Sequence, residues 1–178
     1  MRSLIERSIV QHEGMLGVQL DYLRSLADVS SGLFTKFTLA IPAATHRKHA
    51  PLNAWHLARI GATGVQDCGT CVQYVVNAAL QAGASPEVLR SAVAGDVAAL
   101  SGTDALALRF GEAVAARSPS VEDLRARLGE AIGNEGVVEI ALAVAMVQIY
   151  PILKRGLGQT IACAKVTVEV SDERTMAG

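Results

Sequence analysis

Apolar residues recur every three or four positions through most of the chain, which is the spacing of helices that bury one face. Glycine, proline and potential capping residues divide this pattern into separate segments. The pattern predicts helices over residues 15–27, 33–41, 52–63, 68–81, 86–94, 103–117, 121–132 and 134–155. We therefore expect an all-α fold of about eight helices.

Several boundaries of these helices follow from single residues. Pro42 is expected to end the helix over 33–41, and Asp67 and Ser85 are expected to cap the helices that follow them. Pro151 lies inside the last predicted helix and is expected to kink it. Residues 165–170 alternate polar and apolar side chains with β-branched residues, which predicts a short C-terminal strand.

Composition narrows the class of protein. A chain of 178 residues is about one domain long, so we expect a single domain over 1–178. Hydrophobic residues make up 51% and charged residues 19%, which excludes a disordered chain. A net charge of -1 and an aromatic content of 4% argue against a nucleic-acid partner.

Targeting signals are not expected. The first ten residues already carry Arg2, Glu6 and Arg7, so they lack the apolar segment of a signal peptide. The most apolar stretch, 140–147, is much shorter than the ~20 residues of a membrane span. Three cysteines are an odd number and too few for the disulfide framework of a secreted protein. These observations predict a cytoplasmic protein without a membrane partner.

The sequence Asp67-Cys68-Gly69-Thr70-Cys71 points most directly to chemistry. It lies at the predicted start of a helix, where free backbone N–H groups and the helix dipole favour an anion such as a thiolate. Helical Cβ atoms three residues apart are ~5–6 Å apart, whereas a disulfide needs ~3.8 Å. We therefore expect a Cys68–Cys71 disulfide to distort the helix locally and to be readily reduced, which favours a working redox pair.

Two other interpretations of the cysteine pair stay open. The motif can be half of a zinc site, but the chain has no second Cys-x-x-Cys and no close histidine pair, so we expect no metal. The cysteines can also be small apolar packing residues, as we expect for Cys163 in the apolar segment 161–164.

A polar stripe of Asn53, His56, Arg59 and Thr63 runs along the predicted helix over 52–63. If this helix and the next pack as an antiparallel pair, His56 approaches the cysteines. His56 is then placed to accept a thiol proton and Arg59 to stabilise the thiolate. A solvated helix face is the alternative interpretation of the same stripe.

Other polar residues have weaker signals. Gln73 and Asn77 follow the cysteines on the same predicted helix, where they either hydrogen-bond in a pocket or serve as packing amides. Glu139 opens an apolar run and is expected in an interface or site, or at a rim. His46 and His49 are expected on the surface.

The segment Trp55-His56-Leu57-Ala58-Arg59-Ile60, followed by Asp67-Cys68-Gly69-Thr70-Cys71-Val72-Gln73, resembles the core of the alkylhydroperoxidase D and carboxymuconolactone decarboxylase family. The resemblance covers roughly residues 50–115, with weaker support from 139–155. It implies an all-α fold that assembles as trimers or hexamers. It also implies that Cys71 attacks the hydroperoxide and that Cys68 resolves the sulfenic acid.

Two positions depart from the family pattern. His56 stands where the family commonly has a glutamate, and Val75 stands where it commonly has a histidine. Because valine moves no protons, His56 is expected to serve as the base, with Asp67 or water in support.

The predicted function is therefore that of a thiol-dependent peroxidase without a cofactor, which reduces hydroperoxides and is reset by a dithiol or thioredoxin-like reductant. Helix geometry alone makes Cys68 the more exposed sulfur, and we expect Cys68 to meet this reductant. One alternative is a lyase of the family's other branch, acting on a small lactone or acid by acid–base chemistry. Another is a non-catalytic redox-sensing oligomer.

Overall fold

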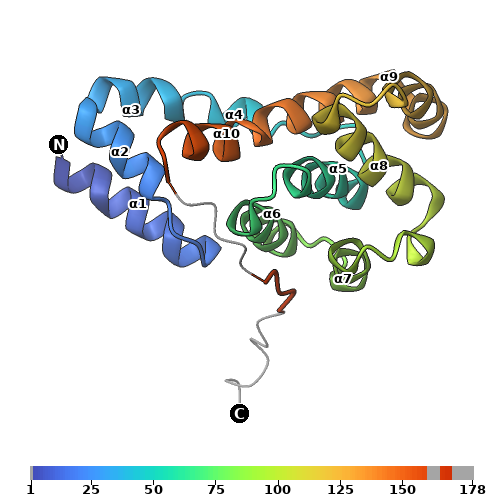
Figure 1. Ribbon diagram of the computed structural model, residues 1–178, viewed down its shortest axis with the longest axis horizontal. Coiled ribbons are helices and arrows are strands. Elements are labelled where there is room, and N and C mark those ends of the chain that lie inside the picture. The colour runs from blue at the N-terminus through green and yellow to red at the C-terminus, as the bar shows by residue number, and fades with distance from the viewer. Residues whose placement is uncertain (1, 160–164, 170–178) are drawn as a thin grey trace, which may run out of the picture.

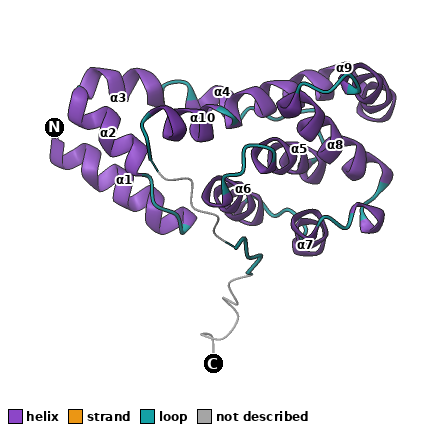
Figure 2. Ribbon diagram, viewed as in Figure 1, coloured by secondary structure: helices purple, strands orange, loops and turns teal. Residues whose placement is uncertain are grey.

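The computed structural model describes residues 2–159 and 165–169. Helices account for most of these residues and no strand occurs among them, which confirms the all-α prediction (Figure 1, Figure 2). The elements are α1 (Arg2–Leu16), α2 (Asp21–Val29), α3 (Ser31–Thr38), α4 (Ile41–Ala44), α5 (Leu52–Gly64), α6 (Gly69–Gln81), α7 (Pro86–Ala94), the 3-10 helix η1 (Val97–Ala99), α8 (Gly102–Ala116), α9 (Val121–Val147) and α10 (Ile149–Gly156).

Helix α5 is the centre of the fold. Every residue from Ala54 to Thr63 is buried, and α5 contacts α6, α7, α8 and α9. Glycines bring α5 and α8 together, because a Cβ at Gly111 would overlap the backbone of Ala58 and one at Gly61 would overlap the carbonyl of Leu108. The close approach buries the face of α5 that carries Ala58 and Gly61.

Two hydrophobic clusters meet at one pair of tyrosines. The larger cluster spans α5 to α9, and the smaller one joins α1 and α2 through residues such as Ile9, Tyr22 and Leu26. Tyr74 of α6 and Tyr150 of α10 pack against both clusters. The N-terminal helices therefore cover the region where α6 begins and α10 passes (Figure 1).

The N-terminal third departs from the predicted boundaries. Residues 2–16 form α1, which was not predicted, and the helix expected over 15–27 is interrupted at Gly17, whose φ is 62°. Pro42 does not end a helix; it lies at the start of the short α4, a position that proline favours. Gly17 adopts a left-handed conformation and ends the helix, although the apolar spacing continues past this residue.

The predicted breaks in the last long helices are confirmed. Gly133 has φ 77° and ψ 163° and separates residues 121–132 from 134–147. The helix breaks again at Gln148, before Pro151. The kink has a clear physical cause, because Pro151 has no N–H to donate to the carbonyl of Val147.

The expected C-terminal strand is not formed over residues 165–169, and Val170 lies outside the described residues. The amide of Gln73 clamps this segment instead: Thr167 N–H donates to Gln73 Oε1 at 2.8 Å, and Gln73 Nε2 donates to the Thr167 carbonyl at 2.9 Å. Val166 and Val168 pack against the large cluster. A side-chain amide thus makes the pair of hydrogen bonds that a neighbouring strand would otherwise make.

Residues 121–156 are long and apolar enough to cross a membrane by length and composition alone. A buried core helix passes the same test, and Val137, Ile140, Val144 and Val147 of α9 are buried in the large cluster. Their burial places this part of the apolar run in the core of the fold.

Candidate functional site

The two cysteines of the motif form a disulfide at the start of α6. Cys68 is the N-cap residue, with φ -118° and ψ 85°, and Cys71 is the third residue of the helix. Their Cα atoms are 5.2 Å apart, within the range that a disulfide spans. The expected distortion of the helix is absent, because Cys68 lies just outside it and is free of helical spacing.

Asp67 does not cap α6 as predicted. It has φ 51°, in the left-handed region that aspartate tolerates better than most residues, and its side chain is exposed. The next residue, Cys68, is the N-cap of α6 and reaches Cys71. The contribution of Asp67 to the site is therefore the conformation of the loop.

The two cysteine residues are both buried, and they differ in exposure in the opposite order to the prediction. Cys68 is 1% exposed and Cys71 is 7% exposed. Cys71 also lines a cavity of about 20 Å³, which is roughly the space for one water-sized group. Thr63, Tyr74 and Tyr150 are among the other lining residues. Cys71 is thus the more exposed residue of the pair and the one that lines the cavity.

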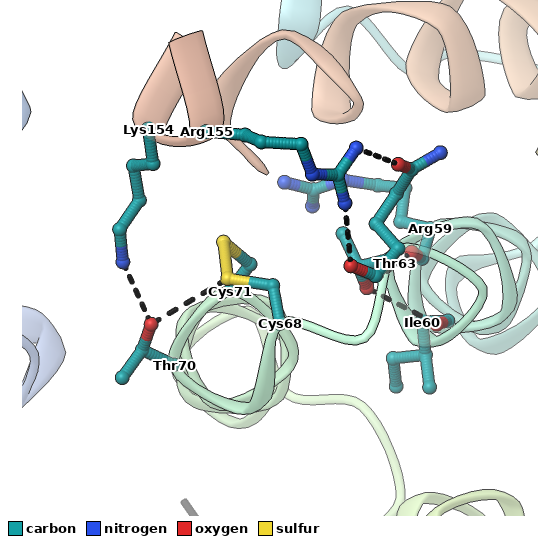
Figure 3. Close-up of a disulfide and its surroundings, with 9 residues drawn as sticks. Arg59, Ile60, Thr63, Cys68, Thr70, Cys71, Lys154 and Arg155 are labelled. Carbon is teal, nitrogen blue, oxygen red and sulfur yellow. Dashed lines mark hydrogen bonds between the residues drawn. A yellow bond between two sulfur atoms is a disulfide. The ribbon is translucent and has the colours of Figure 1, made fainter. Parts of the chain in front are cut away.

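Thr70 and Lys154 connect α10 to Cys68. Lys154 Nζ donates a 2.8 Å hydrogen bond to Thr70 Oγ1, and Thr70 Oγ1 lies 3.6 Å from Cys68 Sγ (Figure 3). Sequence analysis missed both residues as members of a site. Because 84 positions separate Thr70 from Lys154, no local spacing could have paired them.

Arg59 of α5 lies among the residues that surround the disulfide (Figure 3). Its guanidinium lies 4.4 Å from the ring centroid of Trp55, a cation–π contact, and Nη1 donates to His56 Nδ1 at 3.3 Å. Burial lowers the pKa of Arg59, and the hydroxyls of Tyr74 and Tyr150 act in the opposite direction. Its Nε has no hydrogen-bond partner among the described residues, so the charge is only partly satisfied.

His56 is buried at 3% exposure and packs edge-on against Trp55. Burial, together with Arg59 and Arg47, lowers the pKa of His56 to about 3. The ring therefore stays neutral, and its Nδ1 accepts from Arg59. This environment positions Arg59 and disfavours the role of base, which requires a pKa near the working pH.

The polar stripe on α5 is not a solvated face. His56, Arg59 and Thr63 are all buried, and Thr63 Oγ1 donates to the Arg59 carbonyl at 2.8 Å. Asn53 accepts from the Ser85 N–H at 3.1 Å. Tyr74 of α6 and Tyr150 of α10 line a cavity together with Thr63, on the side of α5 opposite the face that packs on α8.

Gln73 and Asn77 are packing amides. Gln73 holds the segment around Thr167, and Asn77 Nδ2 donates to the Leu16 carbonyl at 2.6 Å. Together they tie the end of α1 and the C-terminal segment to α6. The supporting site role expected for Gln73 is therefore replaced by a structural one.

Glu139 is buried and organises the connector before α5. Its carboxylate accepts from the backbone N–H groups of Lys48, His49 and Ala50 at 2.9–3.0 Å, and His46 lies 3.8 Å away. Burial raises the pKa of Glu139, but the three backbone donors and His49 outweigh it and hold the pKa at about 2. Neither a rim nor a site role applies, because every nearby donor belongs to the connector.

Two sequence candidates stay outside this site. Cys163 falls within residues that the structure does not describe. Val75, at the position of the family's histidine, is fully buried in the large cluster. Within residues 2–159 and 165–169, no three His, Cys, Asp or Glu side chains lie close enough to hold a metal ion.

Comparison with known proteins finds no relative of this chain. No family model, curated protein or solved structure matches the chain. Membership of the alkylhydroperoxidase D family stays a prediction from the motif, and the functional proposal depends on the geometry of the site.

Proposed function

We propose that this protein is a thiol-dependent peroxidase that cycles between the Cys68–Cys71 disulfide and the dithiol. The observation that carries the proposal is a disulfide at the N-terminus of a helix whose more accessible sulfur, Cys71, lines a small cavity. Thiolates at such positions are stabilised by backbone N–H groups and the helix dipole, and the cation of Arg59 adds to this effect.

The oxidising half begins at Cys71. Its thiolate attacks the terminal oxygen of a hydroperoxide, an S–O bond forms and the O–O bond breaks. The peroxide is reduced to an alcohol, which leaves after taking a proton, and Cys71 is oxidised to a sulfenic acid. A cavity for about one water-sized group admits the terminal oxygen and excludes a bulky reacting end.

Cys68 then attacks the sulfur of the sulfenic acid. The S–S bond forms, the S–O bond breaks, and hydroxide leaves and is protonated to water. The Cα separation of 5.2 Å means that this step needs no large backbone movement.

An external dithiol completes the cycle. One of its thiolates attacks the more accessible sulfur, Cys71, and Cys68 leaves as a thiolate. The second thiol of the reductant then attacks its own mixed-disulfide sulfur and releases Cys71, so the reductant ends as a disulfide. This route assigns contact with the reductant to Cys71 rather than to Cys68.

The proposed setting is a cytoplasmic homo-oligomer, a trimer or hexamer. An exposed apolar stripe along α9 and α10, made of Val138, Leu142, Ile149 and Ile152, supports self-association because its members repeat at helical spacing on one face.

Replacement of Cys71 by serine tests the function. Cys71→Ser is expected to abolish hydroperoxide turnover in an assay with a dithiol reductant, because the nucleophile is lost. Cys163→Ser, which removes the third thiol, is expected to retain turnover. Unchanged turnover in Cys71→Ser would refute the peroxidase proposal.

A further inference from the structure

A chain of two contacts runs from Lys154 through Thr70 to Cys68. The chemistry of the three groups determines which of them donates each hydrogen bond. A lysine ammonium only donates, so the Thr70 oxygen accepts from Lys154 Nζ at 2.8 Å. The Thr70 hydroxyl proton is then free for a second partner. A disulfide sulfur has no proton to donate, so at 3.6 Å Thr70 is the donor and Cys68 Sγ the acceptor (Figure 3).

We propose that Thr70 carries protons to and from Cys68 and that Lys154, acting through Thr70, is the source and the acceptor of those protons. This inference rests on the proposed redox cycle and deepens it, since it concerns the buried sulfur rather than the one that meets the peroxide.

In the reducing half, the S–S bond breaks and Cys68 takes its electron pair. Thr70 passes its hydroxyl proton to the Cys68 thiolate and receives one from the Lys154 ammonium, which is left as a neutral amine. A leaving thiolate that is stabilised in this way departs faster.

The oxidising half runs the same path in reverse. The Cys68 thiol gives its proton through Thr70 to neutral Lys154, and the resulting thiolate attacks the sulfenic acid of Cys71. The hydroxide that leaves takes a proton from solvent and becomes water. Lys154 ends this half as the ammonium with which the reducing half began.

The surroundings of Lys154 make it easier for its ammonium group to lose and regain a proton. It is half-buried, and burial lowers its pKa while Asp21 acts in the opposite direction, so its neutral form is more accessible than that of a surface lysine. It projects from the last helix, α10, across to the start of α6 (Figure 3).

Other titratable groups surround this chain of contacts. Asp21 of α2 faces Lys154, Arg59 approaches from α5, and Tyr74 of α6 and Tyr150 of α10 line the cavity at Cys71. Burial raises the pKa of Tyr74 and raises that of Tyr150 to about 12, so both hydroxyls stay protonated near neutral pH. Lys154 is the member of this group that is hydrogen-bonded to Thr70.

The test is the pH profile of alkylation of the fully reduced protein by iodoacetamide, with Cys68 and Cys71 quantified separately by mass spectrometry. Thr70→Val keeps the shape of the side chain and removes the hydroxyl. It is expected to raise the pKa of Cys68 by about one unit, so that alkylation of Cys68 at neutral pH slows about tenfold. Lys154→Met is also expected to raise the pKa of Cys68 and to slow its alkylation at neutral pH.

Three controls accompany these variants. Thr70→Ser restores the hydroxyl and is expected to restore the wild-type profile, whereas a packing role for the threonine methyl predicts no rescue. Lys36→Met removes an exposed lysine of α3 and is expected to leave Cys68 unchanged. Circular dichroism of the variants checks that helix content is kept.

A Cys68 profile in Thr70→Val or in Lys154→Met that matches the wild type overturns the inference. The experiment needs no peroxide, so its result is separate from that of the peroxidase assay. A shifted Cys68 profile without peroxide turnover would remove only the proposed substrate. Normal turnover with an unshifted profile would remove only the proton path.

Discussion

Glu139 and Arg59 are two buried charges in one helical bundle, and their surroundings differ. The Glu139 carboxylate accepts from three consecutive backbone N–H groups of the connector before α5. Arg59 has one hydrogen-bond acceptor, His56 Nδ1, and the face of Trp55, and its Nε has no partner in the described part of the chain.

This difference distinguishes a buried charge with a structural role from one that can take part in the thiol chemistry. A buried charge whose hydrogen bonds are complete holds a segment in place, and its removal leaves several groups unpaired. The positive charge of Arg59 is not fully paired, so it can still attract an anion in the surroundings of the disulfide. No such anion exists while the two cysteines are oxidised. On reduction the thiolate of Cys71 or Cys68 is such an anion.

The largest expected effect is on stability at Glu139. Glu139→Ala leaves the buried N–H of Ala50 and the N–H groups of Lys48 and His49 without their acceptor, so we expect the free energy of unfolding to fall by about 3 kcal/mol. For a chain of this length that corresponds to a drop of roughly 10 °C in melting temperature. Thermal unfolding followed by circular dichroism measures it, and alkylation of the cysteines at neutral pH is expected to stay unchanged.

Arg59 is expected to show the opposite pattern. Arg59→Met keeps the length of the side chain and removes the charge, so the pKa of the reactive thiol rises and its alkylation at neutral pH slows about tenfold. Stability is expected to change less than in Glu139→Ala, because replacing a buried charge with an apolar group is often neutral or stabilising. Arg59→Lys, which keeps the charge, is the control. Equal losses of stability in Arg59→Met and Glu139→Ala, with unchanged thiol reactivity, would remove the distinction.

Acid titration sharpens the assignment of Glu139. Its pKa is about 2 in the folded protein and 4.5 ordinarily, so its contribution to stability is complete above pH 4.5 and is lost as the pH falls toward 2. We expect the difference in unfolding free energy between wild type and Glu139→Gln to shrink across this interval. Urea unfolding at a series of pH values measures it, and a difference independent of pH would contradict the assignment.

The smallest effect is expected at His56. Because His56 positions Arg59 and stays neutral, His56→Gln, which keeps an acceptor, should retain peroxide turnover within about threefold. A general base would lose 10²–10⁴-fold on the same substitution. Steady-state turnover decides between the two, and lyase activity on a small lactone that is lost in His56→Ala but kept in Cys68→Ser would instead favour the lyase alternative.

Local sequence signals predicted much of the central fold. The helices α5, α6, α7 and α8 lie close to their predicted ranges, because each is bounded by a glycine, a proline or a serine cap whose effect is local. The cap at Ser85 and the break at Gly133 follow the same rule, whereas the cap of α8 is Ser101, ahead of the predicted start at residue 103. Boundaries failed in the N-terminal helices, where apolar periodicity continued through Gly17.

The sequence by itself determined the helical class, the disulfide-forming spacing of Cys68 and Cys71 and the presence of Arg59 one helix earlier. Only the tertiary structure decided that Cys71 is the more accessible sulfur, that Lys154 reaches Thr70, and that Glu139 anchors the connector rather than a site. The physical reason is range. Helix propensity, caps and turns act over a few residues, whereas burial and hydrogen bonds between α6 and α10, or between α9 and the connector, join positions more than 80 residues apart.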